Sequence, residues 1–174
     1  AKLLHLTPVI YTFREHPKQF LTGEAPAMLT TYAEREERLK TFGEVRFLDF
    51  ASVQHLTAEQ FMRYLHDEQD VDVLLMGYDH RFGSDRLVGF SEYERVGNRV
   101  GLRVVRAYEC LVDSLPVSSS RVRKLLAEAK IEDVNRLLGY RYSISGVVEH
   151  GRAIGSTIGF PTANICLDSP KQLP

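Results

Sequence analysis

Three consecutive serines followed by two arginines form the most informative segment of the chain, Val117-Ser118-Ser119-Ser120-Arg121-Val122-Arg123. The segment stands where a loop is expected to meet an amphipathic helix. A helix start offers unpaired backbone N–H groups and a partial positive charge. Serine hydroxyls and arginine guanidinium groups add further donors, which gives the segment the chemistry of a phosphate site. The simpler alternative is that one serine only caps the helix.

A loop with a histidine and a proline follows the first expected strand, in the order Phe13-Arg14-Glu15-His16-Pro17. At the end of that strand, His16 and Pro17 would wall a pocket at the edge of the sheet. The alternative is an ordinary strand exit, because a proline keeps the residue before it in an extended conformation.

A second loop, Gly77-Tyr78-Asp79-His80-Arg81-Phe82-Gly83, places aromatic, acidic and basic side chains between two glycines. Glycine lets the backbone approach a ligand closely. Phe82 could stack on a planar ligand whose polar edge Asp79 would meet. The alternative is an ordinary turn that begins and ends at the two glycines.

The fourth candidate is Gly155-Ser156-Thr157-Ile158-Gly159-Phe160-Pro161-Thr162-Ala163-Asn164. Thr162 and Asn164 stand two residues apart on an expected strand, so their side chains point to the same face. A hydroxyl and an amide in this arrangement can hold a hydrated Mg²⁺ or a phosphate. The alternative is that both residues merely decorate the strand.

The expected elements place three of these segments at one edge of a sheet. Strands and helices alternate up to Gly139, which predicts an α/β domain with a parallel sheet and helices on both sides. Capping boxes at Thr31-x-x-Glu34 and Thr57-x-x-Gln60 mark two helix starts. Ligands of such sheets bind beyond the carboxyl ends of the strands. The expected strands are 9–13, 45–50, 71–76 and 102–107, and the other expected helices are 91–100, one that ends at 129, and 132–138.

Two further sequence patterns indicate how the chain folds. The continuous apolar run at 71–76 predicts a strand covered on both faces of its sheet. After Gly139 helical signals stop, and Tyr142–Val148 alternates like a strand of an antiparallel sheet. We therefore expect a domain boundary near Tyr140 and a β-rich second domain that begins there.

The amino-acid composition limits the classes of partner that the protein could bind. The 174 residues are 44% hydrophobic and 26% charged, which allows one domain with a core and part of a second. A net charge of −1, without a run of Lys or Arg, argues against nucleic acid. No stretch is long enough to span a bilayer and no secretory signal is visible. Cys110 and Cys166 are expected to be incidental thiols of a reducing compartment. We expect a cytoplasmic monomer or weak homo-oligomer.

The order and spacing of these motifs resemble those of the bacterial bifunctional riboflavin kinase/FMN adenylyltransferases, also called FAD synthetases. The resemblance covers essentially the whole chain, and its serine-arginine and Gly-Phe-Pro-Thr-Ala-Asn segments are the most specific. The matching stretches are Thr12-Phe13-x-x-His16-Pro17, Leu29-Thr30-Thr31 with Glu34 and Arg35, Gly77-x-Asp79-x-x-Phe82-Gly83, Val117-Ser118-Ser119-Ser120-x-Val122-Arg123, Leu137-Leu138-Gly139-x-x-Tyr142 and Gly159-Phe160-Pro161-Thr162-Ala163-Asn164.

The resemblance implies a Rossmann-like nucleotidylyltransferase domain over 1–139 and the N-terminal part of a riboflavin kinase β-barrel over 140–174. The family's first strand and its Gly- and His-bearing phosphate loop have no counterpart here. Most of the barrel has none either, so we expect both ends to be cut, with Ala1-Lys2-Leu3-Leu4-His5-Leu6 as the end of a helix that runs into a strand. His80 stands where the family has an aromatic ring, and no shared role is assigned to it.

The resemblance also implies residue roles. Ser118, Ser119 and Ser120 would hold ATP phosphate oxygens, and Arg123, as catalytic residue, would offset charge on the departing pyrophosphate. Thr162 and Asn164 would hold Mg²⁺ and nucleotide phosphates during phosphorylation of riboflavin to FMN. The residues on the flavin side would be His16, Pro17, Asp79 and Phe82.

Two other readings stay open. The chain could be an inert flavin-binding fragment, because the family's triphosphate loop has no counterpart here. It could instead be an adenylyltransferase for another cofactor precursor, such as a nicotinate- or pantetheine-specific one. That class shares the serine-arginine helix start, but it does not predict the Gly-Phe-Pro-Thr-Ala-Asn segment.

Overall fold

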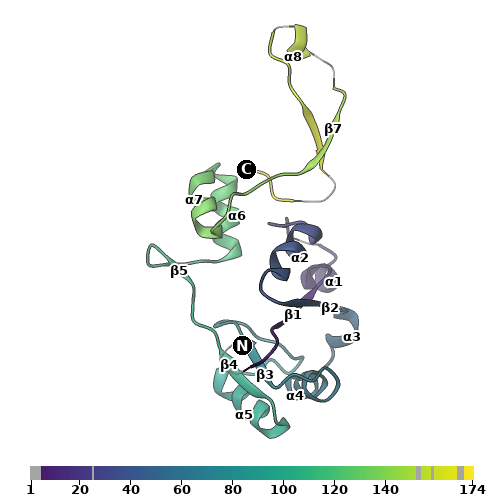
Figure 1. Cartoon of the computed structure of the whole chain (residues 1–174), viewed down its shortest axis with the longest axis vertical. Coiled ribbons are helices and arrows are strands. Elements are labelled where there is room, and N and C mark those ends of the chain that lie inside the picture. Colours follow the sequence, from purple (N-terminus) through teal and green to yellow (C-terminus); the bar gives the residue numbers. More distant parts are fainter. Residues whose placement is uncertain (1–4, 25, 152–153, 158, 168–170) are drawn as a thin grey trace. The chain divides into compact units, whose positions relative to one another are not determined.

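The computed structural model describes residues 5–24, 26–151, 154–157, 159–167 and 171–174. Of the helix end expected at 1–6, residues 1–4 lie outside the described residues, and His5 and Leu6 are not helical. The chain divides into two compact units (Figure 1). Unit 1 comprises Ala1–Glu24 and Glu44–Leu111, and unit 2 comprises Ala25–Gly43 and Val112–Pro174. The predicted boundary near Tyr140 stays a prediction.

Unit 1 contains two pairs of parallel strands. Strand β1 (Val9–Phe13) pairs with β2 (Glu44–Leu48), and β3 (Val73–Met76) pairs with β4 (Arg103–Arg106). The predicted mixed α/β class with parallel pairing is confirmed. Among the described residues, however, these strands form two separate two-stranded sheets, whereas a single sheet with helices on both sides was expected.

The expectation that both faces of β3 are covered is wrong. Met76 is buried, whereas Leu75 is 66% exposed. Successive side chains of a strand point to opposite faces, so the two residues report on different faces of the sheet. The helices that pack on this pair cover the face that holds Met76 and leave Leu75 open.

The core of unit 1 lies between the β3–β4 pair and two helices, α4 (Ala58–Arg63) and α5 (Phe90–Val100). The predicted Thr57–Gln60 capping box starts α4, which continues into an unpredicted π-helix, η2 (Tyr64–Glu68). A Cβ on Gly97 of α5 would lie 2.6 Å from the Leu102 carbonyl oxygen. Glycine therefore allows the helix to approach β4. The buried core residues are Ala58, Met62, Met76, Tyr93, Val100, Leu102 and Val104.

Two short helices of unit 1 were not predicted. Helix α1 (Pro17–Thr22) follows His16, whose Nδ1 accepts a hydrogen bond from Lys18 N at 3.1 Å. Helix α3 (Phe50–Val53) follows Asp49, whose carboxylate accepts hydrogen bonds from Ala51 N and Ser52 Oγ. Strand β2 therefore ends at Leu48, two residues before the predicted end.

Unit 2 is built around a pair of helices. Helices α6 (Ser119–Ala127) and α7 (Ile131–Leu138) share a core of Val122, Leu126, Val134 and Leu137. Helix α2 (Tyr32–Lys40) begins with the predicted Thr31–Glu34 capping box. A small unpredicted hairpin of β5 (Leu111–Val112) and β6 (Leu115–Pro116) precedes α6.

A two-stranded ribbon follows α7. Strand β7 (Gly146–Glu149) pairs antiparallel with β8 (Asn164–Leu167), as the alternating pattern predicts. A short helix between them, α8 (Ile154–Thr157), departs from the expectation that helices stop at Gly139. Among the described residues the ribbon has two strands and no closed barrel is formed, so the predicted barrel start is not confirmed.

The polypeptide's last described residues are tied to α2. Lys171 Nζ donates to Glu34 Oε2 at 2.6 Å, to Glu34 Oε1 at 2.8 Å and to the Ser143 carbonyl at 2.6 Å. It also lies 4.7 Å from the centroid of the Tyr142 ring. We call this set of four residues the Lys171 cluster.

Two expectations from composition can be compared with the structure. Cys110 and Cys166 are free thiols, as predicted, and both are exposed. Within the described ranges, every helix is too short or too polar to cross a bilayer.

Candidate functional site

The serine-arginine segment forms the first turn of α6. Ser118 is the N-cap, and its Oγ accepts a hydrogen bond from Arg121 N at 3.3 Å. The capping alternative is therefore correct for Ser118. Ser119 and Ser120 are exposed in the first helical turn. One hydroxyl thus stabilises the helix start, and two remain directed to the surface beside the positive end of the helix dipole.

Arg123 is oriented by a backbone contact. Its Nε donates to the Ala27 carbonyl at 2.9 Å, and the residue is half-buried. The other N–H groups of this guanidinium have no hydrogen-bond partner within the described part of the chain. Arginine carries five N–H donors in a planar fork. Arg123 therefore combines a fixed orientation with donors that can meet an anion.

His16 and Pro17 form the start of α1. Pro17 is the first helical residue, where its missing N–H removes no helical hydrogen bond. A cavity of about 250 Å³ lies at the carboxyl ends of β1 and β2, but neither His16 nor Pro17 lines it, contrary to the expectation that they wall a pocket. This is the edge of the sheet where ligands of parallel α/β folds bind. Its lining residues are Phe13, Arg14, Glu15, Phe20, Phe47, Leu48, Asp49 and Phe50.

Aromatic rings dominate this cavity, which we call the aromatic pocket. The Phe50 ring meets Phe13 edge-on with centroids 5.3 Å apart, and its centroid lies 5.5 Å from that of Phe20. The Arg14 guanidinium lies 5.4 Å from the centroid of the Phe47 ring. Sequence reasoning missed Phe20, Phe47 and Phe50. The one available signal was that Phe47 and Phe50 stand near the end of a strand parallel to β1.

Phe82 in the second loop is partly buried, and its ring packs on the core. Its centroid lies 4.7 Å from that of Tyr93 and 5.3 Å from that of Phe61. The Tyr93 hydroxyl also donates to the Phe82 carbonyl at 2.8 Å and accepts from Phe82 N at 3.1 Å. Asp79, three residues earlier, is exposed. The loop therefore presents a free carboxylate next to an anchored aromatic residue.

A glycine is required where this loop ends. Gly83 has φ +90°, and a Cβ there would lie 2.9 Å from Ala58 Cα. The Asp85 carboxylate accepts a hydrogen bond from Ala58 N at 2.9 Å, at the start of α4. The end of the loop thus packs closely on the first turn of that helix.

Thr162 and Asn164 were expected on one strand, but β8 begins at Asn164 and Thr162 precedes it, so that expectation is wrong. Both residues lie over glycines of unit 2. A Cβ on Gly155 would lie 3.2 Å from Thr162 Oγ1, and one on Gly151 would lie 2.9 Å from Asn164 Cγ. Both polar residues are exposed. A hydroxyl and an amide oxygen are hard ligands of the kind that Mg²⁺ binds. The residues present therefore fit the ion.

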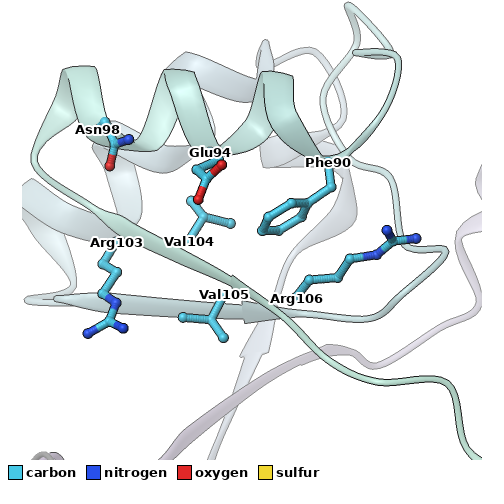
Figure 2. A pocket seen from close by; sticks show the side chains of 7 residues that line it. All are labelled: Phe90, Glu94, Asn98, Arg103, Val104, Val105 and Arg106. Carbon is cyan, nitrogen blue, oxygen red and sulfur yellow. The ribbon is translucent and has the colours of Figure 1, made fainter.

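A larger cavity, of about 450 Å³, lies between α5 and β4 (Figure 2). None of the predicted site residues lines it. Its lining residues are Phe90, Glu94, Asn98, Arg103, Val104, Val105 and Arg106.

The predicted residues fall into three groups. The flavin-side residues all lie in unit 1, whereas the ATP and Mg²⁺ residues lie in unit 2. Within unit 2, the start of α6 carries the three serines and Arg123, and one short segment carries Thr162 and Asn164.

Comparisons with known proteins identify the family of the chain. The FAD synthetase family model matches residues 1–121, and the riboflavin kinase family model matches residues 138–174. Proteins named bifunctional riboflavin kinase/FMN adenylyltransferase are similar to the chain. The relative from Buchnera aphidicola subsp. Schizaphis graminum is 32% identical over 96% of this chain and 55% of its own length. The Escherichia coli K12 relative is 34% identical over 94% of this chain and 54% of its own length.

A third relative, from Pseudomonas fluorescens, is 36% identical over 91% of this chain and 52% of its own length. The chain thus spans about half the length of the curated relatives it matches. A crystal structure described as a macrolide-efflux protein from Streptococcus pneumoniae superposes with a TM-score of 0.87 at 31% identity. It covers 100% of this chain and 58% of that one. On the family models and the named relatives together, the chain belongs to the FAD synthetase family of bifunctional riboflavin kinase/FMN adenylyltransferases.

Proposed function

We propose that the protein makes FAD from FMN and MgATP and phosphorylates riboflavin to FMN. In the first reaction an FMN phosphate oxygen attacks the α-phosphorus of ATP, and the bond to pyrophosphate breaks. The observation that carries the proposal is the α6 start, where a capped helix end, two exposed serines and an oriented arginine meet. The family models and the named relatives support both reactions.

Adenylyl transfer needs in-line positioning and charge neutralisation more than a covalent protein intermediate. Ser119, Ser120 and the backbone N–H groups of the first turn would hold phosphate oxygens. Ser118 would keep that turn in place through its cap to Arg121 N. Arg123, oriented by the Ala27 carbonyl, would meet the charge that gathers on the departing pyrophosphate.

The flavin would be held by unit 1. The aromatic pocket offers apolar rings and the Arg14 guanidinium at the carboxyl ends of two parallel strands. His16 and Pro17 start the helix beside this pocket. Asp79 and Phe82 would contribute a carboxylate and a ring edge from the second loop.

The kinase reaction would use the Thr162 and Asn164 pair. Mg²⁺ bound there would neutralise charge on the ATP phosphates. The β7–β8 ribbon would be the beginning of the small barrel. The exposure of Val147, Val148 and Ile165 supports this assignment. A two-stranded ribbon with exposed apolar side chains needs further strands to bury them. Two free thiols support a cytoplasmic location.

Reciprocal variants of the complete natural protein test the proposal. Arg123→Ala should lower FAD formation about 10²-fold, in the range for one transition-state charge contact, and leave riboflavin phosphorylation intact. Thr162→Ala should abolish riboflavin phosphorylation and spare FAD formation. Arg136→Ala, which removes a surface arginine of neighbouring α7, should change neither rate. An unchanged rate of FAD formation in Arg123→Ala would exclude the catalytic role.

The inert fragment remains the second candidate, because the residues that line the aromatic pocket all belong to unit 1, whereas the α6 start belongs to unit 2. Separate titrations of FMN and ATP distinguish the two. Binding of flavin without binding of ATP would favour the fragment.

A further inference from the structure

Arg106, the last residue of β4, reaches across to the loop that follows β3. Its Nε and Nη2 both donate to the Tyr78 carbonyl oxygen, at 2.9 and 2.5 Å. Figure 2 shows this side chain extending along the end of β4, with its guanidinium toward the neighbouring loop. Charge-assisted hydrogen bonds from a planar fork are stronger and more directional than those between neutral groups. Arg106 therefore fixes the position of one peptide group at the start of the loop.

Tyr78 is held through its side chain as well. Its phenol is hydrogen-bonded to Glu109, and this bond, with burial and the nearby Asp79 charge, raises the pKa of Tyr78. The loop backbone closes on itself next to this residue, where His80 N donates to the Gly77 carbonyl at 3.2 Å. The first part of the loop is thus fixed by contacts of the Tyr78 carbonyl and the Tyr78 phenol and by the turn between Gly77 and His80.

The far side of the same loop is fixed by Tyr93. This residue of α5 is 1% exposed, and its hydroxyl pairs with both the N–H and the carbonyl of Phe82. Between the two anchors stand Asp79, His80 and Arg81, all exposed. The loop therefore holds three polar side chains in solvent on a backbone that is fixed at both ends.

We propose that Arg106 is a positioning residue for flavin binding, which acts by fixing the Tyr78 peptide group and thereby Asp79. This inference rests on the proposed function, in which Asp79 contacts the flavin. A residue whose backbone is fixed before binding does not lose that conformational freedom on binding. Loss of the fork should therefore weaken flavin affinity, with little effect on ATP or on the chemical step.

Arg103 provides a matched control. It lies on β4 three residues before Arg106, is exposed, and lines the same cavity. Figure 2 shows its side chain directed away from the loop. Among the described residues its guanidinium has no hydrogen-bond partner, in contrast to the fork of Arg106. Removing Arg103 changes the local charge equally and leaves the loop contacts in place.

The kinetic test measures FAD formation by the complete natural protein. Arg106→Gln should raise the KM for FMN about tenfold, the effect of releasing one fixed residue, with kcat and the KM for ATP unchanged. Arg106→Lys keeps the charge but not the fork, and should keep most of the defect. Arg103→Gln should behave like the unaltered protein. An unchanged KM for FMN in Arg106→Gln, or an equal rise in Arg103→Gln, overturns the proposal.

A double-mutant cycle shows whether Arg106 acts through Asp79. Asp79→Ala should raise the KM for FMN, and adding Arg106→Gln to it should change the KM little further. Additive effects would overturn the proposed route. If Asp79→Ala raises the KM and Arg106→Gln does not, only the positioning role fails. If Asp79→Ala leaves the KM for FMN unchanged, the proposed role of the loop in flavin binding is wrong, and the positioning role of Arg106 is wrong as well.

Hydrogen exchange gives a readout that does not depend on activity. Amides of Gly77–Gly83 should exchange faster in Arg106→Gln than in Arg103→Gln, whereas those of α5 should not differ. Riboflavin phosphorylation, measured on the same samples, should stay unchanged and report an intact fold. Equal exchange of the loop in both variants would contradict the inference.

Discussion

Replacing Lys171 with methionine tests how much the Lys171 cluster contributes to stability. The Lys171 side chain is 4% exposed and that of Glu34 is 19% exposed, so both charges are largely removed from water. Lys171→Met keeps a long apolar stem but removes the ammonium. The Glu34 carboxylate then keeps one described donor, Thr31 N at 3.0 Å, and the Ser143 carbonyl loses its hydrogen bond from Nζ.

The expected loss of stability in Lys171→Met follows from the burial of the ion pair. Removing one partner of a buried ion pair costs about 3–5 kcal/mol, because the remaining charge is left uncompensated. Glu34 keeps some solvent contact and its capping bond to Thr31, so we expect about 3 kcal/mol, the low end of that range. The Lys40–Glu36 pair on α2 has a similar N···O distance of 2.7 Å but is 62% and 28% exposed. Lys40→Met should cost far less, because an exposed ion pair contributes little to stability.

The assay is chemical denaturation followed by far-UV circular dichroism, for Lys171→Met, Glu34→Gln, the double variant and Lys40→Met. The double variant leaves no unpaired charge, so its cost should be well below the sum of the two single costs. A loss in Lys171→Met no larger than that in Lys40→Met would refute the reasoning. So would additive costs in the double variant.

The pH dependence of the same pair has a definite sign. Burial alone would raise the pKa of Glu34, but hydrogen bonds from Lys171 and Thr31 outweigh it and hold the pKa below its usual 4.5. The folded state therefore binds fewer protons than the unfolded state near this pH. The contribution to stability is complete above about pH 4.5 and is lost as pH falls through the lower folded pKa. Glu34→Gln should remove this part of the acid dependence of denaturation.

Two further variants test packing and capping. Gly97→Ala should destabilise unit 1 by about 1–3 kcal/mol, because its Cβ would meet the Leu102 carbonyl and the Val104 side chain, and α5 would have to move. Gly77→Ala, whose Cβ would come no closer than 3.4 Å to another atom and which needs no positive φ, is the comparison for denaturation, and an equal loss there would contradict the packing argument. Ser118→Ala should cost about 1 kcal/mol of stability through loss of the cap to Arg121 N. Ser118→Asp restores a capping acceptor and should recover that stability, and denaturation midpoints that do not recover would show that the cap is not the cause.

Local hydrogen bonding explains which features were predictable from the sequence. The capping boxes at Thr31 and Thr57 join residues three positions apart, so their pattern is visible in a short window. Parallel pairing of β1 with β2 and of β3 with β4 follows from the alternation of strands and helices. The serine-arginine helix start and the Thr162–Asn164 pair are also local, and their roles remain proposals that the variants above test.

The features that depend on distant residues were decided by tertiary structure alone. Lys171 meets Glu34 across 137 positions, and Arg106 meets the Tyr78 carbonyl across 28. The aromatic pocket exists because two strands end side by side and bring together phenylalanines of β1, α1, β2 and α3. Sequence patterns report the periodicity of one segment, whereas the packing of two segments depends on where the chain returns in space. That is why the residues of the proposed site could be suggested from the sequence, whereas the contacts that hold them in place could not be predicted from it.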